Sequence, residues 1–259
     1  TGQRGIKNAI AMCAKTASAV SCFIKDEGRR TKNEGRAVLV ASTGIIGKQL
    51  PIEKITAGIT KAAAKLSAKA SAGLDFAKAI MTTDTKPKQA VRKFAIDDCR
   101  LTIEKRMPEI GNRKSKIENP VITIAGTVKG AGMIAPNLAT MLCFITTDAA
   151  ISKPMLRRAL KHAIGNSLNK LTVDGHQSTN DTAFILASGL AGNRPIVSQC
   201  PRYKRFAAAL ADLCDDLARQ MALDAEGATR MFKVVVRGAA TKADATKAAR
   251  AVANYPLVK

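Results

Sequence analysis

Residues 129–142 read Lys-Gly-Ala-Gly-Met-Ile-Ala-Pro-Asn-Leu-Ala-Thr-Met-Leu, the most unusual stretch of the 259-residue chain. A lysine, two glycines, a proline and a threonine stand here among apolar residues. Neither G-x-G-x-x-G nor G-x-x-x-x-G-K-[ST] is matched, so a phosphate-binding loop is only weakly indicated. Composition alone favours a tight turn that leads into a buried element.

Helical and strand patterns alternate on both sides of this stretch. Runs of apolar and β-branched residues predict strands at 36–42, 120–126, 182–187 and 231–236. Helix propensity and apolar stripes predict helices at 6–23, 52–72, 152–168, 206–221 and 241–254, the last opened by a capping box from Thr241 to Asp244. Residues 105–118 are expected to be a loop inserted between two strands. The fold class is therefore α/β (α+β), with mixed β-sheets layered with helices.

The chain is strongly basic, with 42 Lys and Arg against 20 Asp and Glu and a formal net charge of +22. Such a balance suggests an anionic partner, for example nucleic acid. The basic clusters are spread along the chain, however, and only nine aromatic residues are available for base stacking. Each cluster, including Lys86-Pro87-Lys88, is therefore expected to be solvated surface charge.

The six cysteines form no C-x-x-C pair, and only two histidines are present. This pattern favours reduced thiols in a cytosolic-type compartment and offers little material for a metal site. The longest apolar stretch, 131–151, is interrupted by Pro136, Asn137 and Asp148, so no membrane-spanning helix is expected. The first residues do not resemble a signal peptide, and the opening Thr1-Gly2 without a methionine suggests a fragment or a processed product.

The order Lys-Gly-x-Gly-Met-x-x-Pro-x-x-Ala-Thr-Met-Leu resembles the cleavage segment of the ornithine acetyltransferases (glutamate N-acetyltransferases), the bifunctional enzymes of cyclic arginine biosynthesis. Members of that family cut their own chain before the threonine. The resemblance implies cleavage between Ala139 and Thr140, with an α-chain-like part at 1–139 and a β-chain-like part at 140–259. It also implies a fold similar to that of the self-processing ornithine acetyltransferases and the DmpA-like aminopeptidases.

Further segments resemble motifs of this family in the same order along the chain. They are Ala-Ser-Thr-Gly-Ile-Ile-Gly at 41–47, Ala-Ile-Met-Thr-Thr-Asp-Thr at 79–85, Thr-Val-Asp-Gly-His-Gln-Ser-Thr-Asn-Asp-Thr at 172–182, Glu-Gly-Ala-Thr at 226–229 and the segment 251–259. The chain departs from the family pattern at His176, Gln177, Ala225 and Arg230. Family chains are longer at both ends, so both terminal regions are expected to be missing from this sequence.

The resemblance implies an enzyme that moves an acetyl group from N2-acetylornithine to glutamate. Thr140 would be the nucleophile once cleavage has freed its α-amine, a base with an ordinary pKa of about 8. The Thr43 hydroxyl and the Gly44 N–H would form the oxyanion hole. No metal or cofactor is needed, and acetyl-CoA enters only as a second acetyl donor.

The family's substrate-binding positions map onto Thr82, Lys129, Thr140 and Glu226. Lys129 would hold a carboxylate and Glu226 a cationic amine. The alternatives without a functional role are a solvated loop lysine and a surface glutamate before a turn. Thr82 would bind substrate or merely cap a turn. The polar block from Asp174 to Asp181 is expected to shape loops around the site.

The resemblance implies an α2β2 heterotetramer in the cytoplasm, or in an organelle matrix in a eukaryote, without nucleic-acid or membrane partners. Three alternatives remain open from the residues. The chain could be a truncated, catalytically incomplete homologue, an aminopeptidase with the same N-terminal-nucleophile chemistry, or a basic nucleic-acid-binding protein. Steep salt dependence of DNA or RNA binding would identify the last of these.

Overall fold

A computed structural model describes residues 2–21, 38–45, 47–96, 119–135 and 141–259. The chain divides into two compact units, Thr1–Phe76 and Ala77–Lys259. The division at 139/140 concerns a cleavage position rather than compactness and stays a prediction. The expected loop at 105–118 lies outside the described residues.

The first unit contains the helices α1 (Gly2–Ser21) and α2 (Ile52–Ala63), which pack against each other. The helix predicted at 6–23 is confirmed over its described part. The helix predicted at 52–72 ends early. Lys65 N–H and Leu66 N–H donate to Ala62 O and Ala63 O in tight turns that close the helix, and the Ser67 hydroxyl then accepts the Lys69 N–H. A new helix, α3 (Ala70–Ala79), follows. The strand predicted at 36–42 is wrong over its described residues 38–42, which form no strand.

The second unit is built on a four-stranded sheet in the order β1 (Lys88–Ala95), β2 (Val121–Lys129), β3 (Leu142–Thr147) and β4 (Thr182–Ala187). β1 and β3 run antiparallel to β2, and β4 runs parallel to β3. The prediction for β4 is confirmed to the residue, and β2 extends three residues beyond its predicted end. The strand predicted at 231–236 is wrong: these residues have no strand partner in the described structure and expose Met231 and Phe232. The mixed sheet and its helices confirm the α/β fold class.

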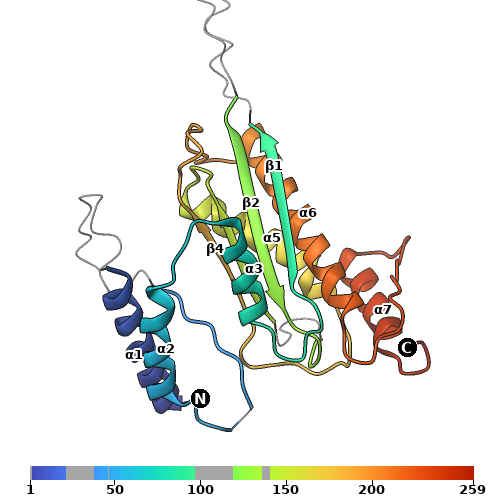
Figure 1. The fold of residues 1–259 in the computed structure, drawn as a ribbon. Coiled ribbons are helices and arrows are strands. Elements are labelled where there is room, and N and C mark those ends of the chain that lie inside the picture. Colours follow the sequence, from blue (N-terminus) through green and yellow to red (C-terminus); the bar gives the residue numbers. More distant parts are fainter. Residues whose placement is uncertain (1, 22–37, 46, 97–118, 136–140) are drawn as a thin grey trace, which may run out of the picture. The chain divides into compact units, whose positions relative to one another are not determined.

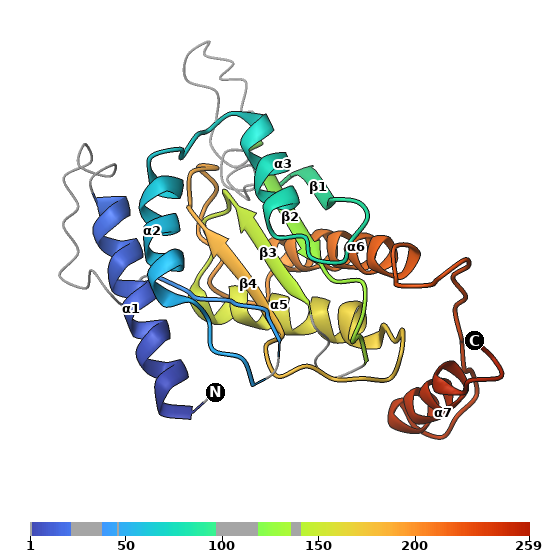
Figure 2. The same cartoon turned by 60° about the horizontal axis from the view of Figure 1, so that its bottom comes forward.

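Helices α5 (Lys153–Asn166) and α6 (Pro201–Leu223) lie on one face of the sheet (Figures 1 and 2). The predicted apolar stripe of α6 is confirmed, since these residues are fully buried: Phe206, Leu210, Leu213, Leu217 and Met221. A Cβ on Gly126 would lie 3.0 Å from Leu213 Cδ2 and 3.1 Å from Leu217 Cδ1. Glycine at this position of β2 therefore allows α6 to approach the sheet closely.

The chain closes with a short 3₁₀ turn (Leu168–Lys170) after α5 and the helix α7 (Lys242–Asn254) near the C-terminus. The predicted capping box is confirmed: the Thr241 hydroxyl accepts the Asp244 N–H at 3.1 Å. No helix in the described part of the chain is both long and apolar enough to cross a membrane.

Candidate active site

The strand register gathers four segments at one end of the sheet. Lys88 pairs with Val128 where β1 begins and β2 ends, and Lys129 pairs with Leu142 at the start of β3. Leu142 in turn pairs with Thr182 at the start of β4. The residues before β1, after β2, before β3 and before β4 therefore meet at this end, which we call the site end of the sheet.

The segment before β1 is organised by the buried carboxylate of Asp84. Its Oδ2 accepts the Thr82 N–H at 3.1 Å, and its Oδ1 accepts the Gly130 N–H at 2.7 Å and a bond from Lys88 Nζ at 2.6 Å. Burial raises the pKa of Asp84, but these hydrogen bonds outweigh burial and hold the pKa below its ordinary value. The carboxylate thus ties the Thr82 segment to the turn after β2.

Lys88 binds a second carboxylate, that of Asp224 just after α6, at 2.5 Å. Asp224 also accepts both the backbone N–H and the hydroxyl of Thr85. The Lys88 side chain is 2% exposed. The expectation of solvated surface charge is therefore wrong at Lys88, because two carboxylates compensate its burial.

Lys129 ends β2 and is almost completely buried. Its Nζ lies 3.4 Å from Thr82 Oγ1, so the structure brings these two predicted substrate-binding residues together. Burial lowers the pKa of Lys129, and the charges of Asp84 and Asp181 act in the opposite direction. The alternative of a solvated loop lysine is excluded by this burial. Thr82 itself is exposed and can meet a ligand.

Glu226 reaches the turn after β2 from the segment after α6. Its N–H donates to Ala131 O at 2.8 Å. A Cβ on Gly132 would lie 2.5 Å from Glu226 Oε2, so the carboxylate packs directly on the α-carbon of Gly132. The exposed Glu226 carboxylate therefore stands beside the turn that begins at Lys129.

Two aspartates of the polar block 174–181 hold the backbone on either side of residues 136–140. Asp174 accepts the N–H groups of Met133 at 2.6 Å and Ile134 at 3.0 Å, and Met133 has a positive φ of 56°. Asp181 Oδ1 accepts the Met141 N–H at 2.8 Å. The expected loop-shaping role of this block agrees with these contacts.

The second oxygen of Asp181, Oδ2, is buried without a hydrogen-bond partner in the described structure. Burial raises the pKa of Asp181 to about 7, against the lowering effects of the Met141 N–H and the Lys129 charge. The site end of the sheet thus carries a carboxyl group that titrates near neutral pH.

This raised pKa predicts a pH-dependent stability effect of Asp181→Asn. The folded protein binds the Asp181 proton more tightly than the unfolded chain, whose pKa is about 4. The ionised carboxylate therefore lowers stability, and the loss grows as the pH rises from about 4 to about 7. The neutral asparagine side chain avoids this loss, so the unfolding free energy of the variant minus that of the unmutated chain should rise across this window.

Urea unfolding between about pH 4.5 and pH 8 measures this difference. The control is Asp148→Asn, because Asp148 also accepts the N–H of a strand residue. A pH-independent difference would contradict the prediction.

The remaining predicted site residues are not joined to this cluster by the structure. Ala139 and Thr140 lie outside the described residues, although Met141, the next residue after Thr140, lies at the site end. Thr43 and Gly44 belong to the first unit, where they precede a turn closed by Lys48 N–H and Ile45 O at 3.1 Å, ahead of α2.

Sequence reasoning missed the ionic residues Asp84, Lys88 and Asp224 as parts of this cluster. Asp84 stands inside the recognised segment 79–85, and Lys88 lies four residues later at the start of an unpredicted strand. Burial alternates along β1, but the sequence Lys-Gln-Ala-Val-Arg-Lys-Phe-Ala does not alternate polar with apolar residues, so it offered no clear strand signal.

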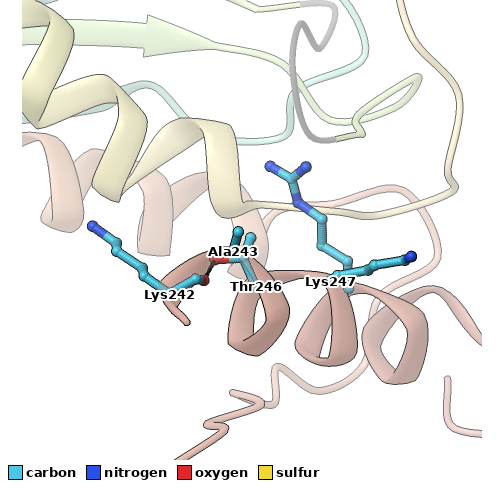
Figure 3. Close-up of a pocket in the computed structure, with 5 residues that line it drawn as sticks. Lys242, Ala243, Thr246 and Lys247 are labelled. Atoms are coloured by element: carbon cyan, nitrogen blue, oxygen red, sulfur yellow. Dashed lines mark hydrogen bonds between the residues drawn. The ribbon is translucent and has the colours of Figure 1, made fainter. Parts of the chain in front are cut away.

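A separate hollow of about 550 Å³ lies along α7 and is lined by Lys242, Ala243, Thr246, Lys247 and Arg250 (Figure 3). None of the residues assigned to the site by sequence lines it. Lys242 Nζ and Arg250 Nη2 both make long bonds of 3.4 Å, to Asn166 Oδ1 and Asn169 O. We therefore interpret this hollow as part of the basic surface of helix α7 and not as a substrate site.

The fold and the cluster define an α/β protein in which residues from distant motifs meet at one end of a mixed sheet. The sequence model of the ArgJ family matches residues 1–107 and 105–259, and the chain belongs to this family. The arginine biosynthesis bifunctional protein ArgJ of Symbiobacterium thermophilum is 45% identical over 259 residues, which are 100% of this chain and 56% of that protein.

Other similar proteins carry the same name. The ArgJ protein of Geobacillus stearothermophilus is 41% identical over all of this chain and 55% of its own length. The mitochondrial ArgJ protein of Sordaria macrospora is 40% identical over all of this chain and 49% of its own length. The chain thus spans about half the length of these relatives. A crystal structure of ArgJ from Bacillus halodurans matches 44% of this chain and 53% of its own at 41% identity, with a TM-score of 0.42.

Proposed function

We propose that this chain is part of a self-cleaving acetyltransferase that moves an acetyl group from N2-acetylornithine to glutamate through an acetyl-Thr140 intermediate. One observation carries the proposal. The register of four strands brings Thr82, Lys129 and Met141 to one end of the sheet, and Glu226 packs on the turn after Lys129. Family membership and the names of the relatives support the acetyltransferase class.

Self-cleavage would begin with attack of Thr140 Oγ on the carbonyl carbon of Ala139. The C–N bond breaks and the freed α-amine takes up a proton, and water then hydrolyses the resulting ester to release the Ala139 carboxylate and the Thr140 hydroxyl. Met141, the residue that follows the proposed nucleophile, is held at the site end of the sheet by the bond from its N–H to Asp181.

In the proposed transfer, the α-amine of Thr140 takes the hydroxyl proton as Oγ attacks the acetyl carbonyl of N-acetylornithine. Ornithine leaves with a proton, and glutamate then accepts the acetyl group. Lys129 would bind a substrate carboxylate, Thr82 would donate or accept a hydrogen bond, and Glu226 would bind the side-chain ammonium of ornithine. Thr43 and Gly44 would stabilise the oxyanion, which is typically worth about 3–4 kcal/mol per donor.

The proposal needs no metal and no resident cofactor, and acetyl-CoA would act only as a second acetyl donor. We propose an α2β2 heterotetramer of the two cleavage products. We further propose a cytoplasmic location, or an organelle matrix in a eukaryote, since one fungal relative is named mitochondrial.

The test is to trap the acetyl-enzyme. The complete gene product that contains this chain is mixed with N-acetylornithine without glutamate, quenched in acid and digested for mass spectrometry. We expect one acetyl group on the hydroxyl of Thr140, which added glutamate removes as N-acetylglutamate. Acetylation confined to lysines would contradict the proposal, and hydrolysis of peptides without acetyl transfer would favour the aminopeptidase alternative.

A further inference from the structure

Asp84 does more in the cluster than pair with Lys88. Its carboxylate is fully buried and receives three donors from three places in the chain: Thr82 N–H, Gly130 N–H and Lys88 Nζ. Thr82 is itself a proposed substrate contact, and Gly130 directly follows the other, Lys129. One carboxylate therefore fixes the backbone at both.

The charge of Asp84 also acts on Lys129, whose neighbour Gly130 donates its N–H to Asp84 Oδ1. A buried lysine tends to lose its proton, because its charged form is poorly solvated there. Asp84 and Asp181 favour the protonated form of Lys129, whereas Lys88 opposes it. The Glu226 carboxylate, which comes from the segment after α6, packs against Gly132 in the turn that follows Lys129.

Asp224 provides an internal comparison. It binds Lys88 from the other side and holds Thr85, so it matches Asp84 as an ionic partner of Lys88. Within the described part of the chain, the N–H groups of Thr82 and Gly130 donate to Asp84 rather than to Asp224, and Asp224 is not among the charges that act on Lys129. A merely structural ion-pair partner would behave like Asp224.

We propose that Asp84 is a positioning residue, which fixes the backbone of Thr82 against the end of β2 and holds its own charge beside the segment that carries the buried Lys129. Its consequence for catalysis rests on the proposed function, whereas the charge state of Lys129 does not. A cationic Lys129 would be the group that selects substrates with a free carboxylate over neutral amides or esters.

The test is a pH titration of Lys129 by NMR in the full chain with 13Cε-labelled lysine, the resonance being assigned with Lys129→Arg. Asp84→Asn keeps the shape and one acceptor oxygen but removes the charge. We expect the titration midpoint of Lys129 to fall by about 1–3 pH units in Asp84→Asn, because a negative charge that favours the protonated lysine has been removed. In Asp224→Asn the midpoint should stay within about half a unit of the unmutated chain, because Asp224 is not among the charges that act on Lys129 and solvent screens weaker effects.

Both variants remove one partner of Lys88, so both should lose stability. If Asp84→Asn does not fold alone, both substitutions are repeated with Gly165→Ala. Gly165 is exposed within α5 with open space around its α-carbon, so alanine should stabilise the helix. Equal midpoints in the Asp84 and Asp224 variants would overturn the proposal.

A second measurement ties the inference to substrate. In the acetyl-transfer assay, Asp84→Asn should raise KM for N-acetylornithine more than tenfold, with the rise growing above the lowered Lys129 midpoint, while Asp224→Asn changes KM less than threefold. An inactive unmutated enzyme would count against the proposed function and leave the NMR result standing. An active enzyme whose KM is unchanged by Asp84→Asn would count against the positioning role alone.

Discussion

Replacing Lys88 with methionine is expected to lower the unfolding free energy by about 3–5 kcal/mol at neutral pH. The methionine fills a similar volume but leaves the carboxylates of Asp84 and Asp224 without their cation. The Asp84 side chain has no exposed surface and that of Asp224 only 9%. Two like charges would then face each other in a region of low dielectric, which is the costly way to break a buried ion pair.

The matched control is Arg92→Met on the same strand. Arg92 also binds two carboxylates, those of Asp212 and Asp216, but these are 67% and 39% exposed. Water screens such pairs, so this loss should be about 0–1 kcal/mol. Denaturant unfolding of both variants measures the contrast. Equal losses of unfolding free energy in the two variants would show that burial does not determine how much the Lys88 ion pairs stabilise the fold.

Gly132→Ala is expected to impair substrate binding much more than stability. The new Cβ would lie 2.5 Å from Glu226 Oε2 and 2.8 Å from Glu226 Cδ, so the carboxylate must move away. Glu226 is exposed and flexible at its end, and the change in unfolding free energy should therefore stay within about 0.5 kcal/mol. If Glu226 binds the ornithine ammonium, loss of this charged hydrogen bond should raise KM for N-acetylornithine about 10- to 100-fold.

Gly165→Ala serves as the control for this glycine, because nothing lies within 4 Å of its added Cβ and it faces solvent on α5. It should leave KM unchanged. Glu226→Gln should reproduce the effect of Gly132→Ala, and the double variant should be no worse than either single variant. An unchanged KM in Gly132→Ala would show that Glu226 does not bind the substrate.

The sequence predicted the elements whose pattern is local and regular. The apolar stripe of α6, the short apolar run of β4 and the capping box of α7 each depend on side chains a few residues apart, and all three predicted elements are confirmed. The strand predicted at 231–236 failed because an apolar run alone does not supply a neighbouring strand, and pairing is a property of the whole sheet.

The candidate site shows the same division. Thr82, Lys129 and Glu226 were mapped from motif resemblance, and the structure places Thr82 beside Lys129 and Glu226 beside the following turn. The ionic support from Asp84, Lys88 and Asp224 could not be predicted, because a basic cluster such as 86–88 looks the same in sequence whether water or two carboxylates surround it. Burial of Lys88 follows only from the register of β1 on β2 and from where α6 ends.

The central proposal is that Thr140 cleaves the peptide bond between Ala139 and itself. Its most direct test is the intact mass, under denaturing conditions, of the 259-residue chain and of the complete protein that contains it, each with and without Thr140→Ala. We expect the unmutated complete protein to give two products, one ending at Ala139 and one beginning at Thr140, while the alanine variant stays in one piece. A single uncut mass for the unmutated complete protein would contradict self-cleavage and favour a catalytically incomplete homologue.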